Sequence, residues 1–222
     1  MPFPYSAVIF DLDGTLVDSI SDISEALNLT LKQLGGQQYP VDVVRRWVGE
    51  GTHALLTTAL EDARLDARAE DIFPLFSKHY DACLLNAARL YPGVIEALRA
   101  LLDVDCRLAI CTNKPSRCIA PLLAHLGVAG YFLAGIGGDT LPKSKPHALP
   151  LLHLAQHFSL KPEACLMVGD SGIDFAAAQS AQMPCALVRY GYSRGFDVDS
   201  AGAVMVVDDL RQLLLLDEHT PS

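Results

Sequence analysis

The chain has 222 residues, of which 50% are apolar, and its formal net charge at pH 7 is -9. This length and apolar content are sufficient to bury the core of one large or two small domains, and the acidic balance argues against nucleic acid and anionic membranes as partners. Because no apolar run approaches the ~20 residues of a membrane-spanning helix and no basic segment precedes the first apolar run, we expect a cytoplasmic protein without a signal peptide.

The N-terminal part of the chain predicts one strand followed by several helices. Residues 7–10 form an unbroken apolar run, which is typical of a buried strand. Apolar residues then recur at helical spacing, with glycines interrupting the pattern. Helices are expected over residues 20–34, 41–48, 53–60 and 70–86. Because no convincing strand occurs between residues 20 and 88, we expect this stretch to form a small helical bundle.

Beyond residue 90, short apolar runs alternate with helical patterns. Strands are expected over residues 108–111, 131–136, 165–168, 186–188 and 204–207. Helices are expected over residues 94–102, 119–126, 148–158 and 175–181, and from residue 209 onward. Such alternation indicates a parallel sheet with helices on both faces. The strand at residues 7–10 has no neighbouring strand in the sequence, so we expect it to join this sheet.

The predicted fold class is therefore α/β, with a Rossmann-like parallel sheet at its core. Residues 1–17 and 88–222 are expected to form the core domain. Residues 18–87 are expected to form a small helical domain inserted after the first strand.

Two aspartates follow the first strand and predict a catalytic site there. On an extended chain alternate residues face the same way, so Asp11 and Asp13 face one side and Leu12 the other. Two carboxylates repel each other by roughly 4 kcal/mol at 4 Å and an effective dielectric constant of ~20. A purely structural site would not keep both without a cation, and Gly14 beside them offers an N–H group that can approach an anion.

Polar residues also follow two other predicted strands. Thr112 and Asn113 come after residues 108–111, and Asp170 and Asp174 come after residues 165–168. In parallel α/β sheets ligands bind beyond the carboxyl ends of the strands, so all these residues are expected at one edge. Lys145 begins another helix and is expected to reach the same edge, with Lys143 as the alternative.

The chemistry of these side chains predicts phosphate transfer to water. Asp11 is the candidate nucleophile and Asp13 the candidate general acid and base. Asp170 is a hard oxygen ligand suited to Mg²⁺, and Asp174 is placed to hold a metal-bound water. Four aspartates against one lysine would repel a phosphate dianion, so a divalent cation is required.

The remaining polar groups are candidates for holding the phosphate. Thr112 and Asn113 offer a hydroxyl and an amide to its oxygens. Lys145 supplies positive charge both to the phosphate and to the Asp11 carboxylate. Gly14 is expected to bring its N–H group close to the same phosphate.

These segments resemble, in order and spacing, the four motifs of the haloacid-dehalogenase superfamily of phosphatases. The matching residues are Asp11-Leu12-Asp13-Gly14-Thr15, Thr112-Asn113, Lys145 with Pro146, and Gly169-Asp170 with Asp174. The resemblance covers nearly the whole chain. It implies that Mg²⁺ is bound by the carboxylates of Asp11 and Asp170 and by the backbone carbonyl of Asp13. It also implies that the inserted helical domain is the small cap of that superfamily.

Within the superfamily, further stretches are similar to the phosphoglycolate phosphatases. They are Arg46-Trp47-Val48-Gly49-Glu50-Gly51, Thr112-Asn113-Lys114-Pro115, Gly137-Gly138-Asp139-Thr140-Leu141-Pro142, Lys145-Pro146-His147 and Tyr190-Gly191-Tyr192. The resemblance implies hydrolysis of 2-phosphoglycolate to glycolate and phosphate through an aspartyl-phosphate. In the cap, Arg46, Gly49, Glu50 and Gly51 are candidates for substrate specificity. Departures from the family pattern occur at Ala148, at Ser193 and at Gly172-Ile173.

Other functions remain open at this point. A phosphosugar phosphatase or a phosphomutase would use the same four motifs. A dehalogenase or a phosphonate-cleaving relative would not need Asp13, which argues against both. A binding module that has lost catalysis is a further alternative, although no residue required for the chemistry is missing. The expected partner is a small phosphorylated substrate, and the expected assembly is a monomer or a homodimer.

Overall fold

The computed structural model describes residues 3–216, so the ends of the expected core domain, residues 1–2 and 217–222, lie outside the described residues. Its main sheet has six parallel strands in the order β5-β4-β1-β6-β7-β8. The strands are β1 (Ala7–Phe10), β4 (Arg107–Cys111), β5 (Ala134–Ile136), β6 (Cys165–Gly169), β7 (Cys185–Val188) and β8 (Met205–Val207). The predicted α/β fold with a Rossmann-like sheet is confirmed.

Strand β1 lies in the middle of this sheet, as its apolar sequence requires. All four of its residues are fully buried, and it pairs in parallel with β4 and with β6. Val8 and Phe10 pack into one apolar cluster and Ala7 and Ile9 into another, because alternate side chains leave opposite faces. Any residue that directly follows β1 is therefore flanked by the ends of two other strands.

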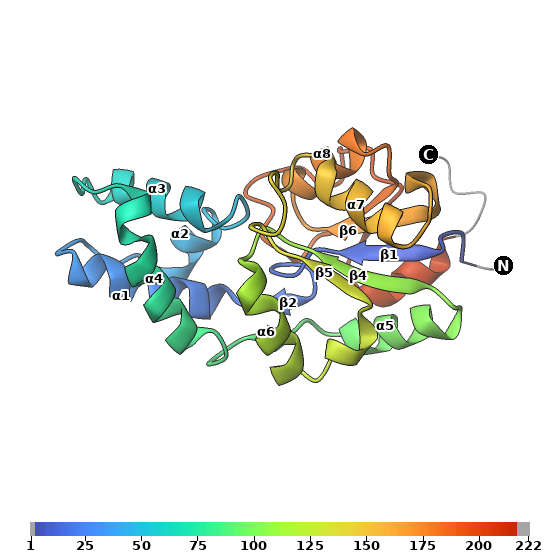
Figure 1. Ribbon diagram of the computed structural model, residues 1–222, viewed down its shortest axis with the longest axis horizontal. Coiled ribbons are helices and arrows are strands. Elements are labelled where there is room, and N and C mark those ends of the chain that lie inside the picture. The colour runs from blue at the N-terminus through green and yellow to red at the C-terminus, as the bar shows by residue number, and fades with distance from the viewer. Residues whose placement is uncertain (1–2, 217–222) are drawn as a thin grey trace.

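Helices cover both faces of the sheet (Figure 1). One face is covered by α5 (Val94–Asp103), α6 (Ile119–His125) and the 3₁₀ turn η4 (Leu210–Leu215), and the other by α7 (Leu149–His157) and α8 (Gly172–Ser180). The helix expected from residue 209 is present as the short 3₁₀ helix η4, which is capped by Asp209. Further 3₁₀ turns are η1 (Ser116–Cys118), η2 (Ala129–Tyr131) and η3 (Pro162–Ala164). Because η2 includes Tyr131, the strand expected over residues 131–136 is shorter and begins at Ala134.

The inserted helical unit has an apolar core of its own beside the sheet domain (Figure 1). Its helices are α1 (Ile20–Gln33), α2 (Val41–Arg45), α3 (Thr52–Asp62) and α4 (Ala69–Cys83). Helix α1 ends where the sequence predicts: Gly35 adopts a φ of +77°, and the N–H of Gly36 donates to Leu31 O at 2.8 Å. None of the helices in residues 3–216 has the length and apolar character needed to cross a bilayer.

Two short strands connect the helical unit to the sheet domain, and the sequence pattern did not predict them. Strand β2 (Val17–Asp18) pairs antiparallel with β3 (Arg89–Leu90). Nearby, the buried Asp22 carboxylate accepts hydrogen bonds from the N–H groups of Ala87 at 2.8 Å and Ala88 at 3.0 Å. The outgoing and returning chain segments are thus held together, although two-residue strands are too short to show a period in the sequence.

Candidate active site

The segment after β1 carries the first two acidic residues of the site. The N–H of Asp11 donates to Val168 O on β6 at 2.9 Å, so the extended backbone continues past the strand. Leu12 is fully buried, whereas Asp11 and Asp13 both line the cavities at the sheet edge. The alternation expected from the sequence is therefore present in the structure.

Gly14 makes room for a carboxylate from another strand. Its φ is +91°, and a Cβ atom at this position would lie 2.5 Å from Asp170 Oδ2. Both the left-handed backbone and the close approach therefore require glycine. Gly14 lines neither of the two cavities at the site, and its N–H donates to Val17 O at 2.9 Å, so nothing in the structure supports the expected contact of this N–H with phosphate.

Three carboxylates gather at the ends of β1 and β6. One oxygen each from Asp11, Asp170 and Asp174 lies within 4.8 Å of the other two. Asp170 accepts hydrogen bonds from Thr15 Oγ1 at 2.8 Å and from the N–H of Tyr192 at 2.5 Å. These two bonds leave the Asp170 carboxylate with one fixed orientation.

The electrostatics of this cluster favour a cation. Burial, together with the Asp174 carboxylate and against the lowering effect of Lys145, raises the pKa of Asp11 to about 6. Burial and the neighbouring Asp174 and Asp11 carboxylates likewise raise the pKa of Asp170. Asp11 Oδ1 is buried and accepts no hydrogen bond of regular geometry from the described residues, although the Lys145 ammonium group lies 2.9 Å from it. Carboxylate oxygens are the ligands that Mg²⁺ prefers, so the residues present fit a divalent cation.

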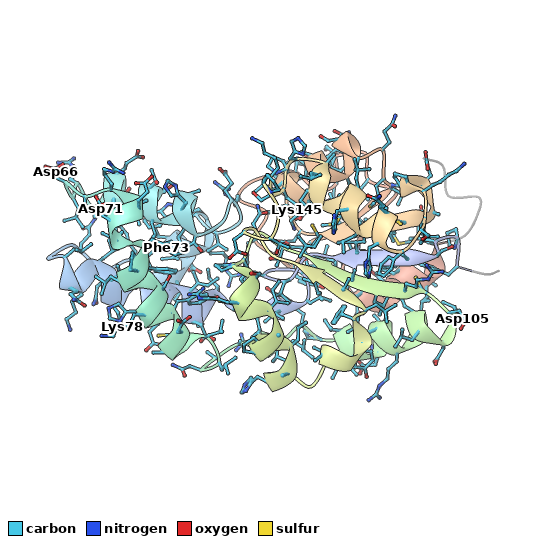
Figure 2. All side chains as sticks on the ribbon, viewed as in Figure 1. Asp66, Asp71, Phe73, Lys78, Asp105 and Lys145 are labelled. Carbon is cyan, nitrogen blue, oxygen red and sulfur yellow. The ribbon has the colours of Figure 1, made fainter. Side chains whose placement is uncertain are left out.

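Lys145 supplies a positive charge next to these carboxylates. Its Nζ lies 2.9 Å from Asp11 Oδ1 and 2.6 Å from Asp174 Oδ1, and only 2% of its side chain is exposed. Lys143 is exposed to solvent, so the lysine at the site is Lys145. Figure 2 shows Lys145 between the helical unit, marked by Phe73, and the opposite end of the sheet domain, marked by Asp105.

Asp174 has a structural task as well as a place in the cluster. It is the third residue of α8, and its Oδ2 accepts hydrogen bonds from Ser171 Oγ at 2.7 Å and from the N–H groups of Asp170 and Ser171 at 3.2 Å. Together with Ser171 it forms the capping box of the helix. Its expected role in holding a metal-bound water stays a prediction.

Thr112 and Asn113 lie at the end of β4, as the sequence predicts, and both line the larger cavity. Thr112 Oγ1 accepts a hydrogen bond from the N–H of Lys114 at 3.2 Å. The Asn113 amide nitrogen donates to Gly49 O at 3.0 Å and to Lys145 O at 2.9 Å. Asn113 therefore joins the sheet domain to the helical unit. Both protons of its amide group are used in these two bonds, so nothing in the structure supports its expected bond to phosphate.

Lys114 is a functional candidate to which sequence reasoning assigned no role. Its Nζ donates to Asp13 Oδ1 at 2.8 Å, to Asp13 Oδ2 at 3.0 Å and to Tyr80 Oη. Ser19 Oγ donates to Asp13 Oδ1 at 2.5 Å, so both carboxylate oxygens of Asp13 are held. In the sequence, Lys114 stood out only as part of the stretch Thr112-Asn113-Lys114-Pro115 that resembles the phosphoglycolate phosphatases.

The cap residues proposed for specificity divide into two groups. Gly49 and Gly51 line the larger cavity. Arg46 and Glu50 are exposed and do not line it, because Glu50 faces Arg194 and pairs with its guanidinium at 2.5 Å. Sequence reasoning could not place the Glu50 side chain, since its partner Arg194 is 144 residues away along the chain.

Two cavities meet at Asp11 and Asp13. The larger, of about 50 Å³, is enclosed mainly by apolar side chains of the helical unit and by polar groups of the sheet domain. Its lining includes Ile23, Val48, Leu55, Phe76, Tyr80, Thr112, Asn113 and Lys114. The smaller, of about 10 Å³, lies against Lys145, Asp170 and Asp174. The geometry thus places a candidate nucleophile between an acidic cluster and a small, largely apolar chamber.

Known proteins with similar sequences and folds carry related descriptions. The profile of the family described as haloacid dehalogenase-like hydrolase matches residues 8–188. The chain is 39% identical over 214 residues to the phosphoglycolate phosphatase of Colwellia psychrerythraea, with 94% of this chain and 95% of that protein covered. It is 40% identical over 212 residues to the phosphoglycolate phosphatase of Pseudomonas putida, with 93% and 78% covered.

A solved structure shows the same similarity in three dimensions. The crystal structure of a predicted phosphoglycolate phosphatase from Haemophilus somnus superposes with a TM-score of 0.87 at 33% identity. The superposition covers 96% of this chain and 97% of that chain. The likeness therefore includes the helical unit as well as the sheet.

Proposed function

This chain belongs to the haloacid dehalogenase-like hydrolase family and is a phosphoric monoester hydrolase, and we propose that its substrate is 2-phosphoglycolate. The products are then glycolate and phosphate. The position of Asp11 carries this proposal. Its carboxylate lies beside the acidic cluster and Lys145, and it also lines the chamber in which a small ester would bind. The relatives named as phosphoglycolate phosphatases support the choice of substrate.

We propose that Asp11 and Asp170 hold Mg²⁺ through their carboxylates, with Asp174 beside them. When bound, Mg²⁺ neutralises phosphate charge and orients the phosphoryl group. The remaining contributions come from the chain itself. Lys145 brings an ammonium group to Asp11 Oδ1, which positions that carboxylate and reduces its repulsion of an incoming dianion.

Hydrolysis proceeds in two steps on this arrangement. The Asp11 carboxylate attacks phosphorus, the ester P–O bond breaks, and the Asp13 carboxyl group gives its proton to the departing oxygen of glycolate. Asp13 then takes a proton from water as this water attacks the aspartyl-phosphate, which releases phosphate and restores Asp11. Lys114 and Ser19 hold the Asp13 carboxylate in a fixed position for both transfers.

We further propose that residues 18–87 form a cap over a core domain of residues 1–17 and 88–222. The chamber is built from both parts, since Ile23, Leu55 and Phe76 come from the helical unit and Thr112 from the sheet domain. Closure of such a cap excludes water during the first step and admits it for the second.

The chamber favours a small acid over a phosphosugar. Its volume is about 50 Å³, and apolar side chains such as Leu55 and Phe76 form much of its lining. Sugar hydroxyls buried against such a surface would lack hydrogen-bond partners, which costs roughly 1–3 kcal/mol for each group. In 2-phosphoglycolate the glycolate oxygen carries the phosphoryl group, so this ester has no free hydroxyl to bury, and its single carboxylate is the one further polar group that needs a partner.

Phosphate release tests the assignment directly. The wild-type protein with Mg²⁺ should release phosphate from 2-phosphoglycolate faster than from hexose phosphates, and chelation of the metal should stop the reaction reversibly. Asp11→Asn should lower kcat by at least about 10³-fold with the fold intact by circular dichroism. Asp105→Asn, a matched change on the exposed turn before β4, should keep full activity.

Unchanged turnover in Asp11→Asn would remove this residue as nucleophile. Conversion of a hexose phosphate into its isomer, without free phosphate, would establish the phosphomutase alternative instead.

A further inference from the structure

We propose that Tyr80 is a specificity-determining residue of this site and that its hydroxyl group donates a hydrogen bond to the carboxylate of the substrate. The inference rests on the proposed function, since it supplies the contact that would select an acid among small phosphate esters. The residue that selects the substrate is then a buried residue of α4, and not the exposed Arg46 or Glu50 that the sequence suggested.

Tyr80 is fixed where such a contact requires it. It lies on the buried face of α4 with 3% of its surface exposed, and it lines the larger cavity together with Asp11 and Asp13. Its ring stacks on Phe76, one helical turn earlier, with centroids 5.5 Å apart and an interplanar angle of 23°. This stacking and the burial leave the hydroxyl with little freedom to move away from the cavity.

The hydrogen-bond pattern around Lys114 leaves the Tyr80 hydroxyl free to donate, beside the hydroxyl groups of Thr52 and Thr112 in the same lining. An ammonium group has three protons, and those of Lys114 are directed to Asp13 Oδ1, Asp13 Oδ2 and Tyr80 Oη. Tyr80 Oη therefore acts as an acceptor toward Lys114. Within residues 3–216, no acceptor is found for the proton of Tyr80 itself. Burial raises the pKa of Tyr80, so the group keeps this proton.

A substrate carboxylate needs a donor at this point. Ile23, Leu55 and Phe76 line the same cavity and offer no hydrogen bond, so a carboxylate pressed against them alone would be desolvated without compensation. A hydroxyl that already accepts from an ammonium group is a stronger donor, because each bond in such a chain polarises the next.

The test compares two esters that differ at the carboxylate. Tyr80→Phe retains the ring and its stacking on Phe76 but removes the hydroxyl. The two substrates are 2-phosphoglycolate and ethyl phosphate, in which a methyl group replaces the carboxylate. We expect kcat/KM for 2-phosphoglycolate to fall roughly 10- to 100-fold, mainly through KM, and kcat/KM for ethyl phosphate to stay within about twofold.

Tyr39→Phe is the matched control in the same helical unit. Tyr39 is also buried, its hydroxyl accepts a hydrogen bond from Gln37, and its ring packs against Trp47, but it lines neither cavity. This variant should treat both substrates as the wild type does.

Two results would overturn the inference while leaving the phosphatase assignment in place. One is an unchanged preference for 2-phosphoglycolate in Tyr80→Phe. The other is an equal loss on both esters, which would mean that Tyr80 acts only through Lys114 and Asp13. The proposed function itself would fail on a different observation, namely wild-type protein that releases no phosphate from 2-phosphoglycolate.

Discussion

At the residue scale, the site holds several carboxylates close together, and neighbouring groups offset part of the repulsion between them. Asp11, Asp170 and Asp174 are buried close together, and the raised pKa values of Asp11 and Asp170 reflect first the burial of their carboxylates and then the repulsion between them. Lys145 offsets part of it by bridging Asp11 and Asp174. A bound divalent cation would neutralise the negative charge of the carboxylates that Lys145 leaves uncompensated.

Gly14→Ala tests how closely the carboxylates are packed. The added Cβ would meet Asp170 Oδ2 at 2.5 Å, so Asp170 must shift, and the Kd for Mg²⁺ should rise roughly 10- to 100-fold, as for the loss of an outer contact to a metal ligand. Isothermal titration with Mg²⁺ measures this change.

Gly35→Ala is the control for backbone strain alone. Gly35 has a φ of +77° and open space around its missing Cβ, so alanine there should cost about 1 kcal/mol of stability without any change in metal affinity. Equal metal affinity in the Gly14 and Gly35 variants would contradict the packing argument.

At the element scale, strand ends and the loops after them decide what faces the site. The loops after β1, β4 and β6 contribute Asp11, Thr112 and Asp170, because parallel strands place their carboxyl ends at one edge. The loop after β7 is the less obvious contributor. It brings the N–H of Tyr192 to Asp170 and the side chain of Arg194 to the helical unit.

Glu50→Gln tests whether the Glu50 side chain, on the loop between α2 and α3, takes part in selecting the substrate. Glu50 is half exposed and pairs with Arg194, and exposed ion pairs contribute at most about 1 kcal/mol. We expect stability in urea to fall by no more than that, and kcat/KM for 2-phosphoglycolate to stay within about twofold of the wild type. A loss above tenfold would show that Glu50 reaches the substrate and would restore the role expected from the sequence.

At the scale of the whole molecule, the site exists only where the two parts of the chain meet. The chamber takes its apolar side chains from the helical unit and its reactive groups from the sheet domain. Asn113 and Arg194 of the sheet domain bond to Gly49 and Glu50 of the helical unit. Stability, metal binding and catalysis are therefore coupled through the same interface.

The buried carboxylates predict how stability depends on pH. The pKa of Asp11 rises from 3.8 to about 6 on folding, so between these pH values the folded chain keeps a proton that the unfolded chain has released. Its contribution to the free energy of unfolding is complete below about pH 3.8 and is lost as the pH passes about 6. A change of this size corresponds to about 3 kcal/mol.

Mg²⁺ should reverse this loss, because it binds the deprotonated carboxylates. The increase in Tm on adding Mg²⁺ to chelator-treated protein should be larger at pH 7.5 than at pH 5. Asp11→Asn should reduce this difference. An increase in Tm that is the same at both pH values would contradict the assignment of Asp11 and Asp170 as a cation site.

The predictable part of the fold came from local patterns. The run at residues 7–10 and the Gly35-Gly36 stop are visible in the sequence, and the structure has β1 and the end of α1 at those places. The paired strands β2 and β3 were missed because each is two residues long and stabilised by its partner rather than by any period. Helix α8 begins at Gly172, earlier than expected, since the capping box of Ser171 and Asp174 sets its start.

The sequence by itself determined the α/β class, the family and the identity of the reactive groups, because strand periodicity and the order of Asp11, Thr112, Lys145 and Asp170 are local properties of the chain. Only the tertiary structure decided what surrounds those groups. Lys114 and Tyr80 meet across the junction between sheet and helices, and Glu50 turns away to Arg194. Contacts between residues so far apart in the chain depend on packing and charge in three dimensions, which no spacing along the sequence encodes.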